Sequence, residues 1–220
     1  MKAYRVFLCR VCTYLFLYLG LMACQKPETE TLPYYNSPDL TPHWYTKSQL
    51  KTIQRHTIGH FQFTDQSGKC ISDKYIKDKI YIANFFFTIC PSICPTMTQN
   101  LLTVQEAFKN DREIVLLSHS VMPATDSVAQ LKKYAERWKI DSRQWHLLTG
   151  DKTQIYRLAR QAYFAEKEIG LQKDNKGFLH TENAFLIDKK GYIRGVYNAT
   201  LPLDIENMIQ DIKLLKAEGV

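Results

Sequence analysis

The stretch that decides the fold is IYIANFFFTICPSICP, residues 80–95. Its first half is almost entirely apolar and aromatic, as expected for a strand that is buried on both faces of a sheet. Its second half holds Cys90 and Cys94 in a Cys-x-x-x-Cys spacing, with Pro91 and Pro95 beside them. Proline fits the first turn of a helix, so Pro95 predicts a helix directly after the pair. The stretch therefore predicts two thiols at the junction of a buried strand and a helix.

Alternating strand and helix patterns surround this junction. Apolar runs predict strands at 113–118 and 145–148. Helical spacing of apolar residues predicts helices over 95–108, over 127–138, and from Asp151 or Thr153 through Ala162. Turn residues predict hairpins at 61–71 and 184–197, and Pro202 opens a last helix. Strand–helix–strand units give parallel strands joined by right-handed crossovers. The predicted fold is an α/β thioredoxin-like sandwich with a central mixed sheet, an N-terminal hairpin and a C-terminal hairpin plus helix. Its site is expected at the carboxyl end of the central strands.

The first residues have the pattern of an export signal. Three cations precede an apolar stretch from residue 11 to 23, which is too short to cross a bilayer as a helix and suits the core of a signal peptide. Residues 21–24, Leu-Met-Ala-Cys, resemble a bacterial lipobox, which implies cleavage before Cys24 and a lipid on its thiol. An uncleaved signal anchor or a plain signal peptide are the alternatives. We expect a lipoprotein signal peptide at 1–23, a tether and lead-in arm at 24–57, and the thioredoxin-like domain at 58–220.

Charge and cysteine content narrow the class of protein. The formal net charge is +7, and it falls by three when Lys2, Arg5 and Arg10 leave with the signal. The chain has no run of Lys or Arg of the kind that binds nucleic acid, so we expect no nucleic-acid partner. Export places the domain outside the cytosol, on the periplasmic side and anchored to the membrane by the lipid, where disulfides can persist. The mature chain keeps only four cysteines, at 24, 70, 90 and 94. This is too few for a disulfide-stapled scaffold, so the close pair is a candidate functional site.

The thiol pair has two possible chemistries. Unpaired N–H groups at a helix N-terminus favour thiolate over thiol, and a thiolate is both a nucleophile and a soft metal ligand. Cys90 and Cys94 can therefore form a redox-active disulfide or bind a metal such as Cu(I) or Zn(II). Two thiolates suit Cu(I), a third imidazole ligand would also hold Cu(II), and zinc would need a fourth ligand. His180 is the candidate third ligand, because it precedes the first strand of the last hairpin, where thioredoxin-like oxidoreductases carry a cis-proline. This chain has no proline between Pro123 and Pro202.

Several motifs together resemble the Sco/SenC family over about residues 58–217. They are Phe-Thr-x-Cys-Pro-x-x-Cys-Pro at 87–95, Trp-x-x-Leu-Thr-Gly at 145–150, His-Thr at 180–181, and Leu-x-Asp-x-x-Gly-x-Ile-Arg-Gly at 186–195. The resemblance implies a membrane-tethered, copper-binding domain that holds one copper per chain, as Cu(I) or Cu(II), through Cys90, Cys94 and His180. It also implies a role in assembling the dinuclear copper site of cytochrome c oxidase subunit II, as a copper donor or as a reductant of that subunit's thiols.

One segment departs from the family's pattern. The family often has Ser-x-Asp-Pro-x-x-Asp-Thr, whereas residues 120–127 read Ser-Val-Met-Pro-Ala-Thr-Asp-Ser. Met122 replaces the first aspartate, so an acidic role near the metal does not carry over to that position. We expect Met122 to be a packed or exposed loop residue and Asp126 to cap the helix that follows. We expect His119 and His146 to pack in strands, and Cys70 to be a buried free thiol.

Two functions therefore stay open. The first is a copper-binding assembly factor, which is not an enzyme in the turnover sense. The second is a dedicated extracytoplasmic thiol–disulfide oxidoreductase that uses a reversible Cys90–Cys94 disulfide. A peroxidase is disfavoured, because its Pro-x-x-x-Thr-x-x-Cys pattern fails at both cysteines: Ala83 and Phe87 precede Cys90, and Phe87 and Pro91 precede Cys94.

Overall fold

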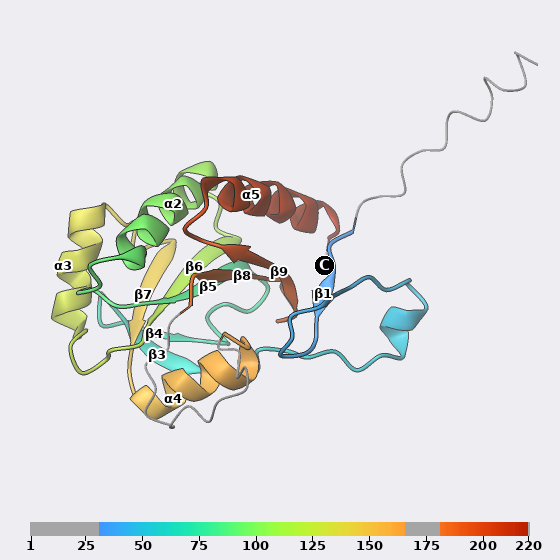
Figure 1. The fold of residues 1–220 in the computed structure, drawn as a ribbon, viewed down its shortest axis with the longest axis horizontal. Coiled ribbons are helices and arrows are strands. Elements are labelled where there is room, and N and C mark those ends of the chain that lie inside the picture. Colours follow the sequence, from blue (N-terminus) through green and yellow to red (C-terminus); the bar gives the residue numbers. More distant parts are fainter. Residues whose placement is uncertain (1–30, 166–180, 220) are drawn as a thin grey trace, which may run out of the picture. The chain divides into compact units, whose positions relative to one another are not determined.

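The structure, a computed structural model, describes residues 31–165 and 181–219. Its strands are β1 (Tyr34–Tyr35), β2 (Pro42–His43), β3 (Gln62–Asp65), β4 (Cys70–Ser72), β5 (Ile80–Phe86), β6 (Ile114–Ser120), β7 (Trp145–Thr149), β8 (Asn183–Ile187) and β9 (Ile193–Asn198). Its helices are the 3-10 turn η1 (Gln49–Lys51), α2 (Ile93–Ala107), α3 (Val128–Trp138), α4 (Lys152–Arg157), the π-helix η2 (Leu158–Ala162) and α5 (Pro202–Ala217). Figure 1 shows their arrangement.

A mixed sheet of seven strands forms the centre of the domain. Its order is β4-β3-β7-β6-β5-β8-β9, with β5, β6 and β7 parallel and the outer pairs antiparallel. Every residue of β5 and β6 is buried, because helices cover both faces of these strands. The mixed sheet with its two hairpins and C-terminal helix confirms the predicted thioredoxin-like fold class.

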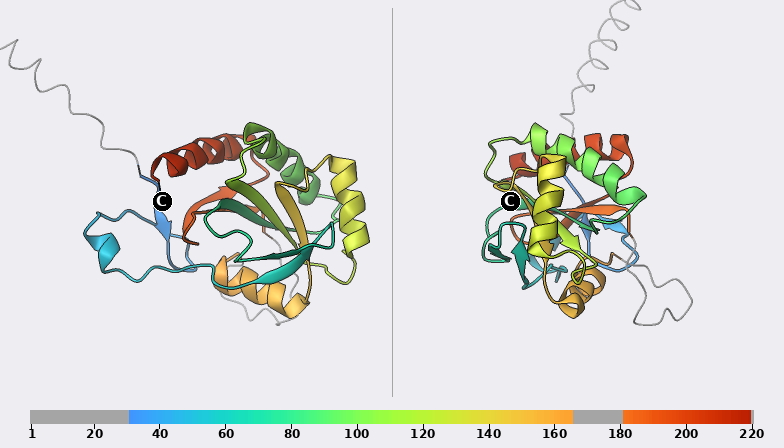
Figure 2. Two further views of the ribbon diagram at one scale, coloured as in Figure 1. Left: turned by 180° about the vertical axis from the view of Figure 1, so that it is seen from behind. Right: turned by 90° about the vertical axis from the view of Figure 1, so that its left-hand side faces the viewer.

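Two hydrophobic layers cover the two faces of this sheet. On one face α2, α3 and α5 pack together with both cysteines of the pair, and we call this layer the α2-side core. On the other face α4 and η2 pack with the segment around β3, and we call this layer the α4-side core. The right-hand view of Figure 2 shows α2 and α5 on one side of the sheet and α4 on the other. The sheet therefore separates the thiol pair from the α4 side.

The lead-in arm is part of the compact unit, which begins at Thr31. Leu32 is buried in the α2-side core and Tyr34 is buried beside Tyr192. The buried guanidinium of Arg194 donates to the carbonyl oxygens of Leu32 (2.8 Å) and Pro33 (3.0 Å) and lies over the Tyr34 ring. It also pairs with Asp188 and Glu218. The start of the arm is thus fixed to β9 and to the end of α5.

Two sequence-based expectations need correction or refinement, and a third is confirmed. Cys70 is an exposed free thiol at the edge strand β4, so its predicted burial is wrong. The predicted helix up to residue 162 changes from α-helix to π-helix at Leu158. His119 and His146 do pack in strands, where both are almost fully buried. No helix in the described ranges is long and apolar enough to cross a membrane.

Candidate functional site: the thiol pair at the start of α2

The fold brings the two thiols to the carboxyl end of β5. Cys90 lies in the loop after this strand, and Cys94 lies in the first turn of α2. Both side chains are buried, with 7% and 3% of their surface exposed, and both are free thiols. Ser92, at the N-cap of α2, makes no side-chain capping hydrogen bond within the described residues, which leaves the first N–H groups of the helix available to the sulfurs. The strand–helix junction predicted from the sequence is thus the junction observed.

The two thiols differ in acidity. Burial opposes ionisation of Cys90, but hydrogen bonds from the backbone of Cys94, Ser92 and Ile93 and from the Cys94 thiol outweigh it, so the pKa of Cys90 is lowered. Burial raises the pKa of Cys94 well above its ordinary value, and the Cys90 sulfur and the Asp126 carboxylate add to this effect. Cys90 is therefore the more acidic thiol of the pair, and it loses its proton before Cys94 does. A cation between the sulfurs would relieve the repulsion at Cys94, so the pair fits a soft, thiophilic ion.

A buried carboxylate, that of Asp126, fixes the start of the thiol loop. Asp126 is fully buried and accepts hydrogen bonds from the Thr88 N–H (3.2 and 3.3 Å), the Thr88 hydroxyl (2.5 Å) and the Ser120 hydroxyl (2.5 Å). Gln130 on α3 donates to the same Thr88 hydroxyl at 3.2 Å. These bonds tie the residue two positions before Cys90 to the end of β6 and the start of α3. Asp126 is a positioning residue that sequence reasoning missed.

The predicted capping role of Asp126 is wrong. Ser127 is the N-cap residue of α3, and its hydroxyl accepts the N–H of Gln130 at 3.3 Å. The carboxylate of Asp126 turns inward instead, because the Thr88 and Ser120 groups supply donors inside the fold. Nothing in the local sequence distinguishes these two orientations, since Asp and Ser are both good caps.

Aromatic and apolar side chains surround the sulfurs. The Tyr134 hydroxyl on α3 lies 2.8 Å from the Thr98 hydroxyl on α2, and its ring packs against Phe86. Burial raises the pKa of Tyr134 to about 12, and negative charge at the cysteines contributes, so the phenol stays neutral beside the pair. Ile89, directly before Cys90, is 56% exposed. The sulfurs therefore lie among aromatic and apolar side chains, and the loop exposes one large apolar side chain, Ile89.

The other candidate residues fall in different places. His180 and Cys24 lie outside the described residues. Met122 is half-buried and packs against the α4-side core, on the sheet face opposite the thiol pair. Within residues 31–165 and 181–219, no group of three or more His, Cys, Asp or Glu side chains is arranged to hold a metal. The described part thus supplies two of the three predicted ligands.

The chain that follows His180 runs close to the thiol side. Asn183 begins β8, and Ala184 is in register with Asn84 near the carboxyl end of β5. The carbonyl of Glu182 accepts the N–H of Ala199 (2.8 Å), and the carbonyl of Ala199 accepts from Asn100 of α2 (2.9 Å). Residues 182–184 are therefore joined directly to the strand that precedes the thiol loop, and through Ala199 to the helix that follows it.

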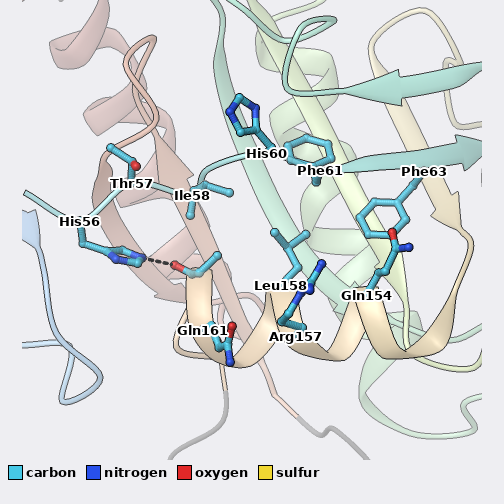
Figure 3. A pocket seen from close by; sticks show the side chains of 11 residues that line it. His56, Thr57, Ile58, His60, Phe61, Phe63, Gln154, Arg157, Leu158 and Gln161 are labelled. Atoms are coloured by element: carbon cyan, nitrogen blue, oxygen red, sulfur yellow. Dashed lines mark hydrogen bonds between the residues drawn. The ribbon is translucent and has the colours of Figure 1, made fainter.

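A separate pocket lies on the α4 side (Figure 3). It is a cavity of about 220 Å³ between residues 56–63 and the helical segment 154–162. Phe61, Phe63 and Leu158 give it apolar walls, and the imidazole of His56 is held by the carbonyl of Ala162 at 2.7 Å. The sheet separates this pocket from Cys90 and Cys94.

Fold and site together define a thioredoxin-like protein with a Cys-x-x-x-Cys pair at the start of its first long helix. The sequence profile of the SCO1/SenC family matches residues 50–217, and the chain belongs to this family. A SCO1/SenC family lipoprotein of Bacillus anthracis is 29% identical, with a TM-score of 0.64, over 73% of this chain and 95% of that one.

Two further solved structures are similar at comparable identity. BsSco, described as a member of the Sco family of cytochrome c oxidase assembly proteins with a disulfide switch, is 27% identical with a TM-score of 0.63, over 74% of this chain and 94% of that one. Bradyrhizobium japonicum ScoI with copper bound is 27% identical with a TM-score of 0.56, over 69% of this chain and 96% of that one.

Proposed function

We propose that this protein is a membrane-tethered copper chaperone that delivers copper to, or maintains the thiols of, the dinuclear copper site of cytochrome c oxidase subunit II. The observation that carries the proposal is the pair of buried, interacting free thiols at the N-terminus of α2. Membership of the SCO1/SenC family supports it. The copper-bound Bradyrhizobium structure and the description of BsSco as an oxidase assembly protein point to the same role.

Cys90, Cys94 and His180 are the proposed ligands of one copper ion per chain. Thiolate and imidazole are ligands that copper accepts in both Cu(I) and Cu(II) states. The described neighbours of His180 support its part, because Ala184 pairs with β5 and Glu182 is hydrogen-bonded to Ala199, which in turn is hydrogen-bonded to Asn100 of α2. Within the apo pair, Cys90 offers a thiolate first, and Cys94 gives up its proton when a cation enters.

The proposed location is extracytoplasmic, on the periplasmic side, with a lipid on Cys24. The lipobox-like residues 21–24 support this location, and the similar Bacillus anthracis protein is named a lipoprotein. The lipid would keep the site near a membrane-bound partner.

Copper loading of the reduced protein tests the three-ligand proposal. We expect one tightly held copper per chain and a thiolate-to-Cu(II) absorption band, both weakened or lost in His180→Ala. The matched control is His60→Ala, which removes an exposed imidazole beside Asp73 and should bind copper as the wild type does. A His180→Ala protein with unchanged copper content and spectrum would overturn the ligand assignment.

A second function is favoured by the direct interaction of the two sulfurs. The Cys90 thiolate can attack a substrate disulfide and form a mixed disulfide, and Cys94 then displaces the substrate. The two steps leave a Cys90–Cys94 disulfide and a substrate dithiol. Two electrons pass to the substrate, and its two departing thiolates take up the Cys94 proton and one proton from the solvent. In the same experiment, no retained copper together with ready cycling of the pair against a glutathione buffer would favour this thiol reductase.

A further inference from the structure

The lead-in arm presents an exposed tryptophan. Trp44, directly after β2, has 63% of its surface exposed. The described residues expose only three other large hydrophobic side chains, Ile89, Leu201 and Leu203, and all of these are aliphatic. An indole has an apolar body and one N–H donor, which makes it a preferred side chain at the boundary between lipid and water.

The indole is held at the place where the tether enters the domain. Its Nε1 donates to the carbonyl oxygen of Thr31 at 3.1 Å. The neighbouring Tyr45 packs against the buried Tyr34 ring (5.8 Å between centroids), and its hydroxyl accepts from Asn36 at 3.0 Å. Trp44 is therefore fixed beside Thr31, the first described residue, rather than at an arbitrary surface position.

Covalent geometry limits how far Trp44 can lie from the proposed anchor. Seven residue steps separate Cys24 from Thr31, and an extended chain covers at most about 3.6 Å per residue. The reach of this tether is thus at most about 25 Å. Trp44 is hydrogen-bonded to Thr31, so its distance from Cys24 can exceed this limit by no more than the length of one side chain.

The charge of the arm also suits a lipid surface. Residues 40–57 of the arm contain no Asp or Glu but include Lys47, Lys51 and Arg55, and the nearest acidic residue before them is Asp39. Lys47 and Lys51 are exposed, and lysines near an anionic membrane are attracted to it. In Figure 1 this part of the arm extends away from the sheet, on the side opposite α2 and α3.

We propose that Trp44 inserts into the headgroup region of the membrane, with Lys47 and Lys51 beside it, and so fixes the orientation of the domain. The proposal rests on the lipid anchor at Cys24 but not on copper binding. The two proposals can therefore fail separately. Metal content tests copper binding, and tryptophan fluorescence tests the membrane contact of Trp44.

Depth-dependent quenching tests this contact with the full lipidated chain in vesicles of phosphatidylcholine with phosphatidylglycerol, prepared with and without brominated acyl chains. We expect bromolipids to quench part of the tryptophan emission and Trp44→Phe to lose that quenched part. Trp145 is buried and Trp138 is half-buried, so both should contribute an unquenched background.

The matched control places the reporter elsewhere. Leu203, at the start of α5, is 66% exposed, and Leu203→Trp in the Trp44→Phe background should show no quenching. Wild type and Trp44→Phe quenched equally, or equal quenching at positions 44 and 203, would overturn the proposal.

Discussion

At the residue scale, Asp126 links the position of the thiol loop to its acidity. Burial is the main cause of the raised pKa of Cys94, and the charge of this carboxylate, which holds the loop through Thr88, adds to it. Met122 carries no charge and packs on the opposite side of the sheet. A buried anion near the sulfurs disfavours an empty dithiolate and favours a bound cation.

Replacing Asp126 by Asn should lower the pKa of Cys94, because the repulsive charge is removed while much of the shape is kept. Copper affinity should fall in the same variant, since the loop loses charge-assisted hydrogen bonds, each of which contributes about 1.5–3 kcal/mol. The measurement is the pH dependence of alkylation at each cysteine, followed by mass spectrometry, together with competition for copper.

Asp65→Asn is the matched control for this change. Asp65, at the end of β3, is also buried, and it accepts from the N–H groups of Ser67 and Lys69 in the β3–β4 turn. Its carboxylate lies 2.9 Å from Nδ1 of His146 on β7. Its replacement should destabilise the fold without shifting Cys94. Equal shifts of Cys94 in both variants would show that the effect is general destabilisation rather than the charge of Asp126.

At the scale of elements, the junction of β5 and α2 could be predicted because its signals are local. An apolar run, two prolines and the cysteine spacing all lie within residues 80–95. The docking of the arm could not, because Arg194 reaches Leu32 and Pro33 across more than 160 positions of the chain. The exposure of Cys70 has a similar cause, since β4 is the edge strand and, within the described residues, pairs with β3 alone.

Arg194 should fix the arm to the domain. Arg194→Met leaves the buried Asp188 and the nearby Glu218 without their cation, and breaking a buried pair in this way costs about 3–5 kcal/mol. We expect this loss in urea unfolding, together with faster proteolytic cleavage between residues 36 and 53.

Arg143→Met serves as the comparison for Arg194→Met. Arg143 pairs with Asp141, but 83% of its side chain is exposed, so its loss should leave the free energy of unfolding nearly unchanged. If both variants were destabilised equally, the arm would not depend on the buried network.

At the scale of the whole molecule, a buried histidine couples the core to pH. His119 on β6 is fully buried among Phe61, Phe63, Phe85 and Tyr163. Neither ring nitrogen has a hydrogen-bond partner among residues 31–165 and 181–219. Burial lowers its pKa from 6.5 to about 3. The sequence predicted a packing role for this residue but gave no sign that its nitrogens would be unpaired.

The free energy of unfolding should therefore fall as the solution is acidified. The unfolded chain takes up a proton on His119 below about pH 6.5, whereas the folded chain does so only near pH 3. Above pH 6.5, His119 is neutral in both states and does not lower the free energy of unfolding. As the pH falls from 6.5 towards 3, this free energy declines by up to about 1.4 kcal/mol per pH unit.

His119→Phe should flatten this decline, because a phenyl ring fits the aromatic surroundings and binds no proton. Urea unfolding at a series of pH values measures the slope. His43→Phe, at an exposed side chain on β2, should keep the wild-type slope, and an unchanged slope in His119→Phe would assign the acid sensitivity to other groups.

Helix α5 has a mechanical consequence for the proposed anchoring. It runs for 16 residues, about 24 Å, from Ala199 and Asn100 at one end to Glu218 and the fixed arm at the other. With the arm on the lipid surface, α5 keeps the α2 end of the domain at a fixed distance from the arm. The thiol pair then meets membrane-bound acceptors by diffusion in two dimensions, at a distance from the membrane that the length of α5 helps to set.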